Sequence, residues 1–80
     1  MEIFSVIKEM LVKELALDDE AVVPEAHLQD DLGADSLALL NLTELIGKRY
    51  DIGITGDDLV EINSVSELVA LIESKISSKE

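Results

Sequence analysis

The sequence is poor in several residue types: it has no cysteine and no tryptophan, and one each of proline, histidine, tyrosine and phenylalanine. Without cysteine the chain forms no disulfide, no thiolate metal site and no cysteine nucleophile, so any thiol chemistry must arrive on a cofactor. Basic residues are scarce as well, since six Lys and Arg stand against eighteen Asp and Glu, for a net charge of −12. Because phosphates would repel such a surface, we expect no binding to nucleic acid and favour basic protein partners.

Long hydrophobic runs are also missing. The first nine residues, Met1–Glu9, contain no basic segment followed by an apolar stretch, so they resemble neither a signal peptide nor a membrane span. We therefore expect a cytoplasmic protein without membrane insertion. A chain of 80 residues supports one small core, so we predict a single domain over residues 1–80.

Apolar residues recur at three- and four-residue spacings in three stretches, which predicts amphipathic helices over residues 3–15, 36–50 and 64 to about 77. A short helical turn is expected near Asp58–Glu61. The segment Ile52-Gly53-Ile54 is too short for a sheet and is interpreted as an extended linker. Residues 16–35 predict a long surface loop, pinned to the core by Val22, Val23, Leu28 and Leu32. The predicted fold is all-α: a small bundle of three main helices plus one short helix, with the long loop between helices one and two.

Two leucines are left over when residues 36–50 are placed on a helical wheel. The arc expected to face the core holds Ala38, Leu39, Leu42, Leu45, Ile46 and Tyr50. The opposite arc is polar, and Leu37 and Leu40 fall in or beside it. Both lie within about one turn of Ser36, so we expect them to be the apolar centre of a docking surface. The residues expected to contact a partner are Asp35, Leu37, Leu40, Asn41, Glu44 and Lys48.

The segment Gly33-Ala34-Asp35-Ser36-Leu37 places a serine hydroxyl where a polar loop meets a helix, with Asp35 or Ser36 as the N-cap. Gly33 is expected to supply a backbone angle that this turn requires. A helix start presents unpaired N–H groups and the positive end of the macrodipole, so a phosphate esterified to Ser36 would be stabilised there. Ser36 is therefore the first candidate for a functional residue.

A resemblance supports this candidate. The heptapeptide Asp31-Leu32-Gly33-Ala34-Asp35-Ser36-Leu37 resembles the phosphopantetheine attachment motif of acyl carrier proteins. Downstream, Tyr50-Asp51-Ile52-Gly53-Ile54 resembles the aromatic-Asp-Ile-x-Ile segment that follows the second helix in that family. The resemblance covers essentially the whole chain.

The resemblance implies a carrier with no catalysis of its own. A phosphopantetheinyl transferase would move 4'-phosphopantetheine from coenzyme A onto Ser36, and acyl groups would then be carried as thioesters on the cofactor's thiol. The implied partners are that transferase and acyl-transferring or acyl-modifying enzymes such as ketosynthases and acyltransferases, met by a monomeric carrier. The acyl chain would enter a cleft whose candidate lining is Leu39, Leu42, Leu45, Ile46, Ile54, Leu59, Ile62 and Leu68.

The second helix departs from the family's pattern of acidic side chains. Ala38, Asn41 and Gly47 stand where carriers of fatty acid synthesis often have acids, and Lys48 is basic. From Leu37 to Tyr50 the charges are Glu44 against Lys48 and Arg49, a sum of +1. Because rim charges discriminate between partners, we interpret the chain as a carrier for a dedicated pathway; a housekeeping carrier with an altered surface is the alternative.

Three functions of other classes are weighed against the carrier. A serine hydrolase is disfavoured because this chain has no Gly-x-Ser-x-Gly turn and only His27 as an imidazole base. We expect His27 to be a solvated loop residue. A calcium loop starting at Asp31 would have Gly33 as its third position and Ser36 as its sixth, which does not fit an EF-hand. An acidic module that binds divalent cations weakly or interacts with other proteins remains, and an interaction module predicts that Ser36 is never modified.

Overall fold

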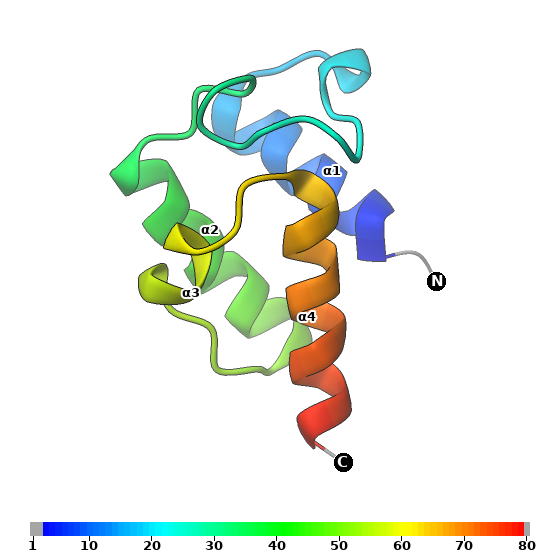
Figure 1. The fold of residues 1–80 in the computed structure, drawn as a ribbon, viewed down its shortest axis with the longest axis vertical. Helices are drawn as coiled ribbons and strands as arrows, with labels where there is room; N and C mark the ends of the chain where they lie inside the picture. Colours follow the sequence, from blue (N-terminus) through cyan, green and yellow to red (C-terminus); the bar gives the residue numbers. More distant parts are fainter. Residues whose placement is uncertain (1–2, 80) are drawn as a thin grey trace.

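The computed structural model describes residues 3–79, and within them the chain forms four α-helices. The helices are α1 (Ile3–Leu15), α2 (Ser36–Tyr50), α3 (Gly56–Val60) and α4 (Val65–Lys79), and a 3-10 turn, η1 (Asp19–Ala21), lies in the long loop between α1 and α2 (Figure 1). The described residues contain no strand, only an isolated antiparallel bridge between His27 and Ser64. The predicted all-α bundle is confirmed.

The start of α2 is fixed by a side-chain cap. Asp35 adopts an extended conformation, and its Oδ1 accepts the N–H of Ala38 at 2.9 Å, so Asp35 and not Ser36 is the N-cap. Two residues earlier, Gly33 has φ of +72°, the left-handed conformation that the turn was expected to require. The helix ends at Tyr50, is followed by the left-handed C-cap residue Asp51, and has Lys48 and Arg49 in its last turn.

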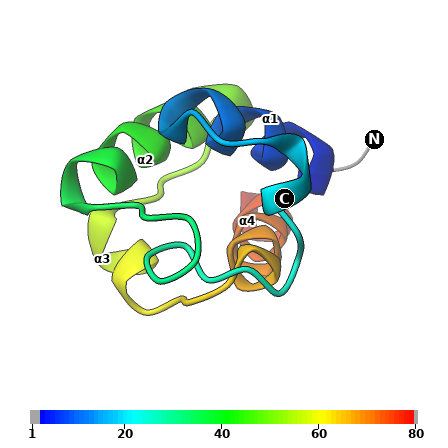
Figure 2. The same cartoon turned by 90° about the horizontal axis from the view of Figure 1, so that it is seen from above.

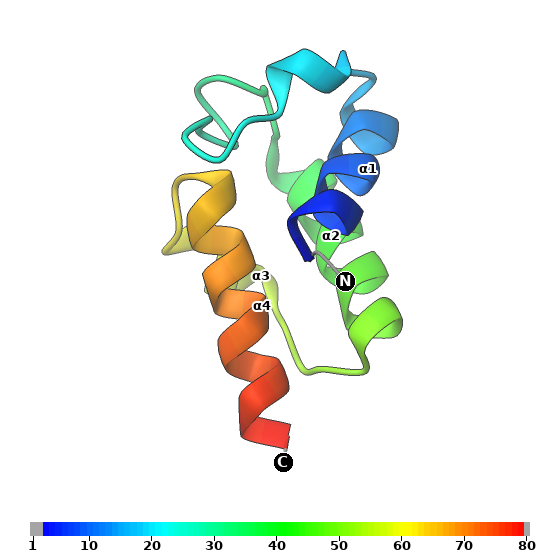
Figure 3. The same cartoon turned by 90° about the vertical axis from the view of Figure 1, so that its right-hand side faces the viewer.

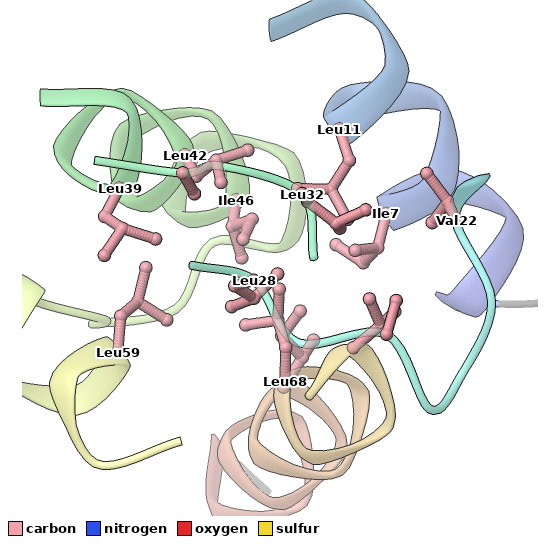
Figure 4. Close-up of a cluster of buried hydrophobic side chains, with 14 residues drawn as sticks. Ile7, Leu11, Val22, Leu28, Leu32, Leu39, Leu42, Ile46, Leu59 and Leu68 are labelled. Atoms are coloured by element: carbon pink, nitrogen blue, oxygen red, sulfur yellow. The ribbon is translucent and has the colours of Figure 1, made fainter. Parts of the chain in front are cut away.

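Helices α1, α2 and α4 enclose one core, and the long loop closes its end (Figures 2 and 3). Figure 4 shows side chains from the helices and the loop pointing into the same space, Leu28 between Ile46 and Leu68 among them. The loop contributes Val22, Ala26, Leu28, Leu32 and Ala34 to the buried cluster. The prediction that Val23 anchors the loop is wrong. Val23 is exposed, because its neighbour Val22 takes the inward position.

The buried face of α2 differs from the predicted arc at two positions. Leu45 is 39% exposed, and Thr43 is buried with its hydroxyl donating to the carbonyl of Leu40 at 2.6 Å. The reason is that α2 packs against α1 on one side and α3 on the other, so the buried arc shifts towards α3 and leaves Leu45 at the rim beside α1.

The loop is joined to the start of α4 by backbone hydrogen bonds. The N–H of Leu28 donates to the carbonyl of Asn63 at 2.8 Å, and that of Val65 donates to Ala26 at 3.0 Å. The Glu67 carboxylate accepts the N–H of Asn63 at 2.6 Å and that of Ser64 at 3.3 Å, which confirms the capping box predicted for this helix start.

Glu67→Gln is expected to remove a pH-dependent part of the stability. Hydrogen bonds from the N–H groups of Asn63 and then Ser64 hold the pKa of the Glu67 carboxyl below its usual value of 4.5. Because the carboxylate is favoured in the folded state, its contribution is present above about pH 4.5 and lost as the pH falls through the lowered pKa.

The measurement is the melting temperature of the parent and of Glu67→Gln between about pH 6 and pH 3. The parent should melt higher at the upper end, and the two curves should converge in acid. Glu73→Gln, on the same helix, is the matched control for loss of one charge. A difference that stays constant across this range would contradict the prediction.

Candidate functional site

Ser36 is exposed and is the first residue of α2. The turn before it is held by two backbone hydrogen bonds, from Ala34 N–H to the carbonyl of Leu28 at 2.8 Å and from Leu39 N–H to that of Asp35 at 2.9 Å. The Ser36 hydroxyl is therefore exposed to solvent at a helix N-terminus whose backbone is hydrogen-bonded both before and after Ser36.

The first turn of α2 contains backbone N–H groups without a protein acceptor among the described residues. Asp35 takes the N–H of Ala38, while the hydrogen bonds of the described residues assign no protein acceptor to the N–H groups of Ser36 and Leu37. Together with the macrodipole, these two donors favour negative charge next to the Ser36 hydroxyl. The carboxylate of Asp35 has the opposite effect, so the site favours an anion that is covalently attached more than one that must bind freely.

An apolar surface lies beside this serine. It consists of Leu37, Leu40 and Val60, whose exposed fractions are 67%, 54% and 69%. The Cδ2 atom of Leu40 lies within van der Waals distance of where a Cβ on Gly56 would stand. Val60 follows Gly56 by four residues in α3 and so lies on the same side of that helix, from which we infer that the surface passes from α2 to α3. Large apolar side chains this exposed indicate a binding surface when they are grouped.

The predicted partner-contact residues are all exposed: Asp35, Leu37, Leu40, Asn41, Glu44 and Lys48. Sequence reasoning did not find Val60. A signal was available, since Leu59 and Val60 are adjacent in a five-residue helix and only one of them can face the core; Leu59 is buried there.

A small cavity of about 80 Å³ opens between the long loop, the first half of α2 and α3. Of the predicted cleft residues, Leu39, Leu59 and Ile62 line it, with His27 and Asp30 among the polar lining. Leu42, Ile46 and Leu68 are instead fully buried core residues, and Ile54 is half-buried. Leu45 lines a different groove, between α1 and α2, together with Met10 and Arg49.

His27 does not form a nucleophile–base pair with Ser36 in the described residues. The backbone N–H of His27 donates to Oδ2 of Asp31 at 2.8 Å, and its imidazole Nδ1 lies 3.7 Å from Oδ2 of Asp30, at the half-exposed surface of the loop. This is the solvated position that was expected. The described part of the chain brings no three His, Asp or Glu side chains into a metal-binding group, and no helix in it is long and apolar enough to span a membrane.

Comparison with known proteins gives a consistent result. Residues 5–72 match the family described as "Phosphopantetheine attachment site". The chain is 39% identical over 75 residues to the acyl carrier protein of Thermotoga maritima, covering 94% of this chain and 93% of that protein. It is 38% identical over 76 residues to the acyl carrier protein of Desulforapulum autotrophicum, covering 94% and 99%. A third relative, the acyl carrier protein of Petrotoga mobilis, is 34% identical over 76 residues, covering 95% and 89%.

These similarities extend over almost the whole chain, and they agree with the helical fold. Acyl carrier proteins are carriers and not enzymes, and the matched family indicates a covalently attached 4'-phosphopantetheine. Such carriers interact with a phosphopantetheinyl transferase and with biosynthetic enzymes, most commonly those of fatty acid biosynthesis. On its motif, its fold and its relatives, the chain belongs to the acyl carrier protein family.

Proposed function

We propose that the Ser36 hydroxyl is the attachment point of 4'-phosphopantetheine. The single observation that carries the proposal is the position of Ser36: an exposed hydroxyl on the first residue of α2, inside the motif that resembles the family's attachment site. The free N–H groups of Ser36 and Leu37 fit the phosphate of this cofactor, since they offer donors where its negative charge would lie.

The attachment is a phosphoryl transfer in which this chain is the acceptor. A bond forms between Ser36 Oγ and the phosphorus next to the pantetheine, and the phosphoanhydride bond of coenzyme A breaks. Adenosine 3',5'-bisphosphate is the leaving group, and the hydroxyl proton is released to the medium. The transferase supplies Mg²⁺ for this step. When bound, the cofactor supplies the thiol that this cysteine-free chain lacks. The role of the chain is to present the hydroxyl on a fixed helix start and to offer its surface to partner enzymes, with the cargo held at high effective concentration.

The test is the intact mass of the protein after incubation with coenzyme A, Mg²⁺ and a promiscuous phosphopantetheinyl transferase. We expect a gain of one phosphopantetheinyl group, and fragmentation should place it on Ser36 and on none of the other six serines. If several transferases that modify a control carrier add nothing here, the chain is an acidic interaction module and the proposal is wrong.

We further propose that the carrier serves a dedicated pathway of fatty acid, lipid or polyketide biosynthesis, acting in the cytoplasm as a monomer. The charge of α2 supports this: Glu44, Lys48 and Arg49 sum to +1, although the chain has a net charge of −12. Its partners then need an apolar patch for Leu37, Leu40 and Val60 and fewer basic residues facing α2. A housekeeping carrier of fatty acid synthesis is the second candidate, favoured by the similarity to proteins named only as acyl carrier proteins.

Lys48→Glu is expected to make the carrier a better substrate for a housekeeping ketosynthase. The change turns the charge of α2 from +1 to −1 at an exposed position. One favourable surface pair contributes about 0.2–1 kcal/mol, so kcat/KM should rise by roughly 1.4- to fivefold. Lys13→Glu makes the same charge change at an exposed position of α1 and should have little effect on kcat/KM. A parent carrier that already equals a carrier with an acidic second helix would contradict the dedicated role.

A further inference from the structure

Helix α3 is short and has few means of holding its position. It spans Gly56–Val60 and buries one side chain, Leu59. Its start is closed by a capping box: the N–H of Asp58 donates to Oγ1 of Thr55 at 3.4 Å, and the N–H of Thr55 donates to Oδ2 of Asp58 at 3.1 Å. A five-residue helix is too short to be stable alone, so its position depends on contacts with the rest of the fold.

One such contact comes from the distant end of the chain. Lys75 of α4 places its Nζ 3.3 Å from Oδ2 of Asp58, the same oxygen that accepts the N–H of Thr55. The two side chains are only 31% and 30% exposed, so the pair is more shielded from solvent than an ordinary surface pair. The hydrogen bond from the Thr55 backbone, followed by the hydrogen bond and charge of Lys75, holds the pKa of the Asp58 carboxyl below its usual value.

The position of α3 affects the surface next to Ser36. Val60, at the end of α3, is the most exposed part of the apolar surface, and both Leu59 and Val60 line the small cavity. A displacement of α3 would move Val60 relative to Leu37 and Leu40, and it would open or close that cavity. Helical periodicity does not predict this pair, because it joins side chains of two different helices.

We propose that Lys75 is a positioning residue of this carrier: its ion pair with Asp58 ties α3 to α4 and thereby fixes Val60 and the α3 side of the small cavity. Asp58 is then committed to the fold, and partners meet Asp57 and Glu61, the exposed acids on either side of it. That α3 is held by Lys75 follows from this geometry alone. The consequence for partner docking rests on the proposed function.

The test compares Lys75→Met, Lys75→Arg and Lys8→Met in the full unmodified chain by NMR hydrogen exchange. The reporters are the amides of Leu59 and Ile62, whose N–H groups bond to the carbonyls of Thr55 and Leu59. Lys75→Met should speed their exchange by about two- to fivefold, as expected for loss of one surface pair, and leave α1 amides unchanged. Lys75→Arg should restore the parent rates. Lys8→Met removes the same charge from a half-buried position of α1 and should leave the exchange of Leu59 and of Ile62 unchanged.

A double-mutant cycle with Asp58→Asn separates the pair from other effects of each change. The combined variant should exchange no faster at Leu59 than the faster of the two single variants, because both remove the same interaction.

The proposal would be overturned by equal effects of Lys75→Met and Lys8→Met, by an effect spread over all helices, or by no rescue from Lys75→Arg. With an active phosphopantetheinyl transferase, Lys75→Met should raise KM and leave kcat unchanged, since α3 belongs to the proposed docking surface and the reacting hydroxyl lies on α2. The exchange result does not depend on whether Ser36 is modified, so a failure here is distinct from a failure of the proposed function.

Discussion

Ser36→Ala is expected to abolish phosphopantetheine attachment completely while leaving the fold intact. The reaction needs an oxygen nucleophile at this position, and alanine has none to offer. The fold should tolerate the change because the side chain that caps α2 is Asp35, which accepts the Ala38 N–H, and not Ser36. Alanine also has the highest helix propensity, so the first position of the helix accepts it readily. The measurement is intact mass after the transferase reaction, together with the melting temperature of the unmodified variant.

The matched control is Ser5→Ala, which removes an exposed serine hydroxyl from α1. This variant should gain one phosphopantetheinyl group as the parent does. Both variants should melt within a few degrees of the parent, since surface substitutions change stability by less than about 0.5 kcal/mol. Modification of Ser36→Ala at full extent would show that another serine is the acceptor. A large loss of stability in Ser36→Ala would show instead that its hydroxyl holds the turn.

The sequence predicts helices α1 and α2 well, because the signals for both are local. Helices α1 and α2 have the predicted bounds because each has a continuous apolar stripe, and Asp35 supplies a cap where the second one begins. The short helix α3 was predicted two residues late, at Asp58–Glu61, since the Thr55 cap that starts it belongs to a segment with no periodicity. The last helix was predicted to end near Ser77, and α4 runs to Lys79.

The residues of the candidate site also fall into those that the sequence predicted and those that it did not. Ser36 and its exposed neighbours on α2 follow from a motif and a helical wheel, both of which are local properties of the sequence. Lys75 does not, because its role depends on where α3 and α4 lie in space. Val60 was missed although one signal existed, since only one of Leu59 and Val60 can face the core. Leu45 was misplaced for a related reason: its exposure is decided by how α2 is rotated between α1 and α3, which a wheel drawn for one helix does not contain.

Leu42→Ala is expected to destabilise the protein more than any surface change discussed above. Leu42 is fully buried at the centre of α2, in the cluster that includes Ile46 and Leu68 (Figure 4). Removing its isobutyl group leaves a cavity in a close-packed core, and such substitutions cost about 2–5 kcal/mol. Small domains have about 0.05–0.15 kcal/mol of stability per residue, so a chain of this length would lose a large part of its total. The melting temperature should fall by roughly 10–30 °C.

The same substitution on the exposed side of the helix separates packing from docking. Leu37→Ala removes the same atoms from a side chain that is 67% exposed, so its melting temperature should stay within a few degrees of the parent's. Its transfer kinetics should suffer nonetheless, with a raised KM, because Leu37 belongs to the apolar surface beside Ser36. Thermal unfolding and transferase kinetics on both variants measure the two effects. If Leu37→Ala destabilised the fold as much as Leu42→Ala, or left KM unchanged, the exposed face of α2 would not be the docking surface, since its leucines would then serve packing or nothing at all.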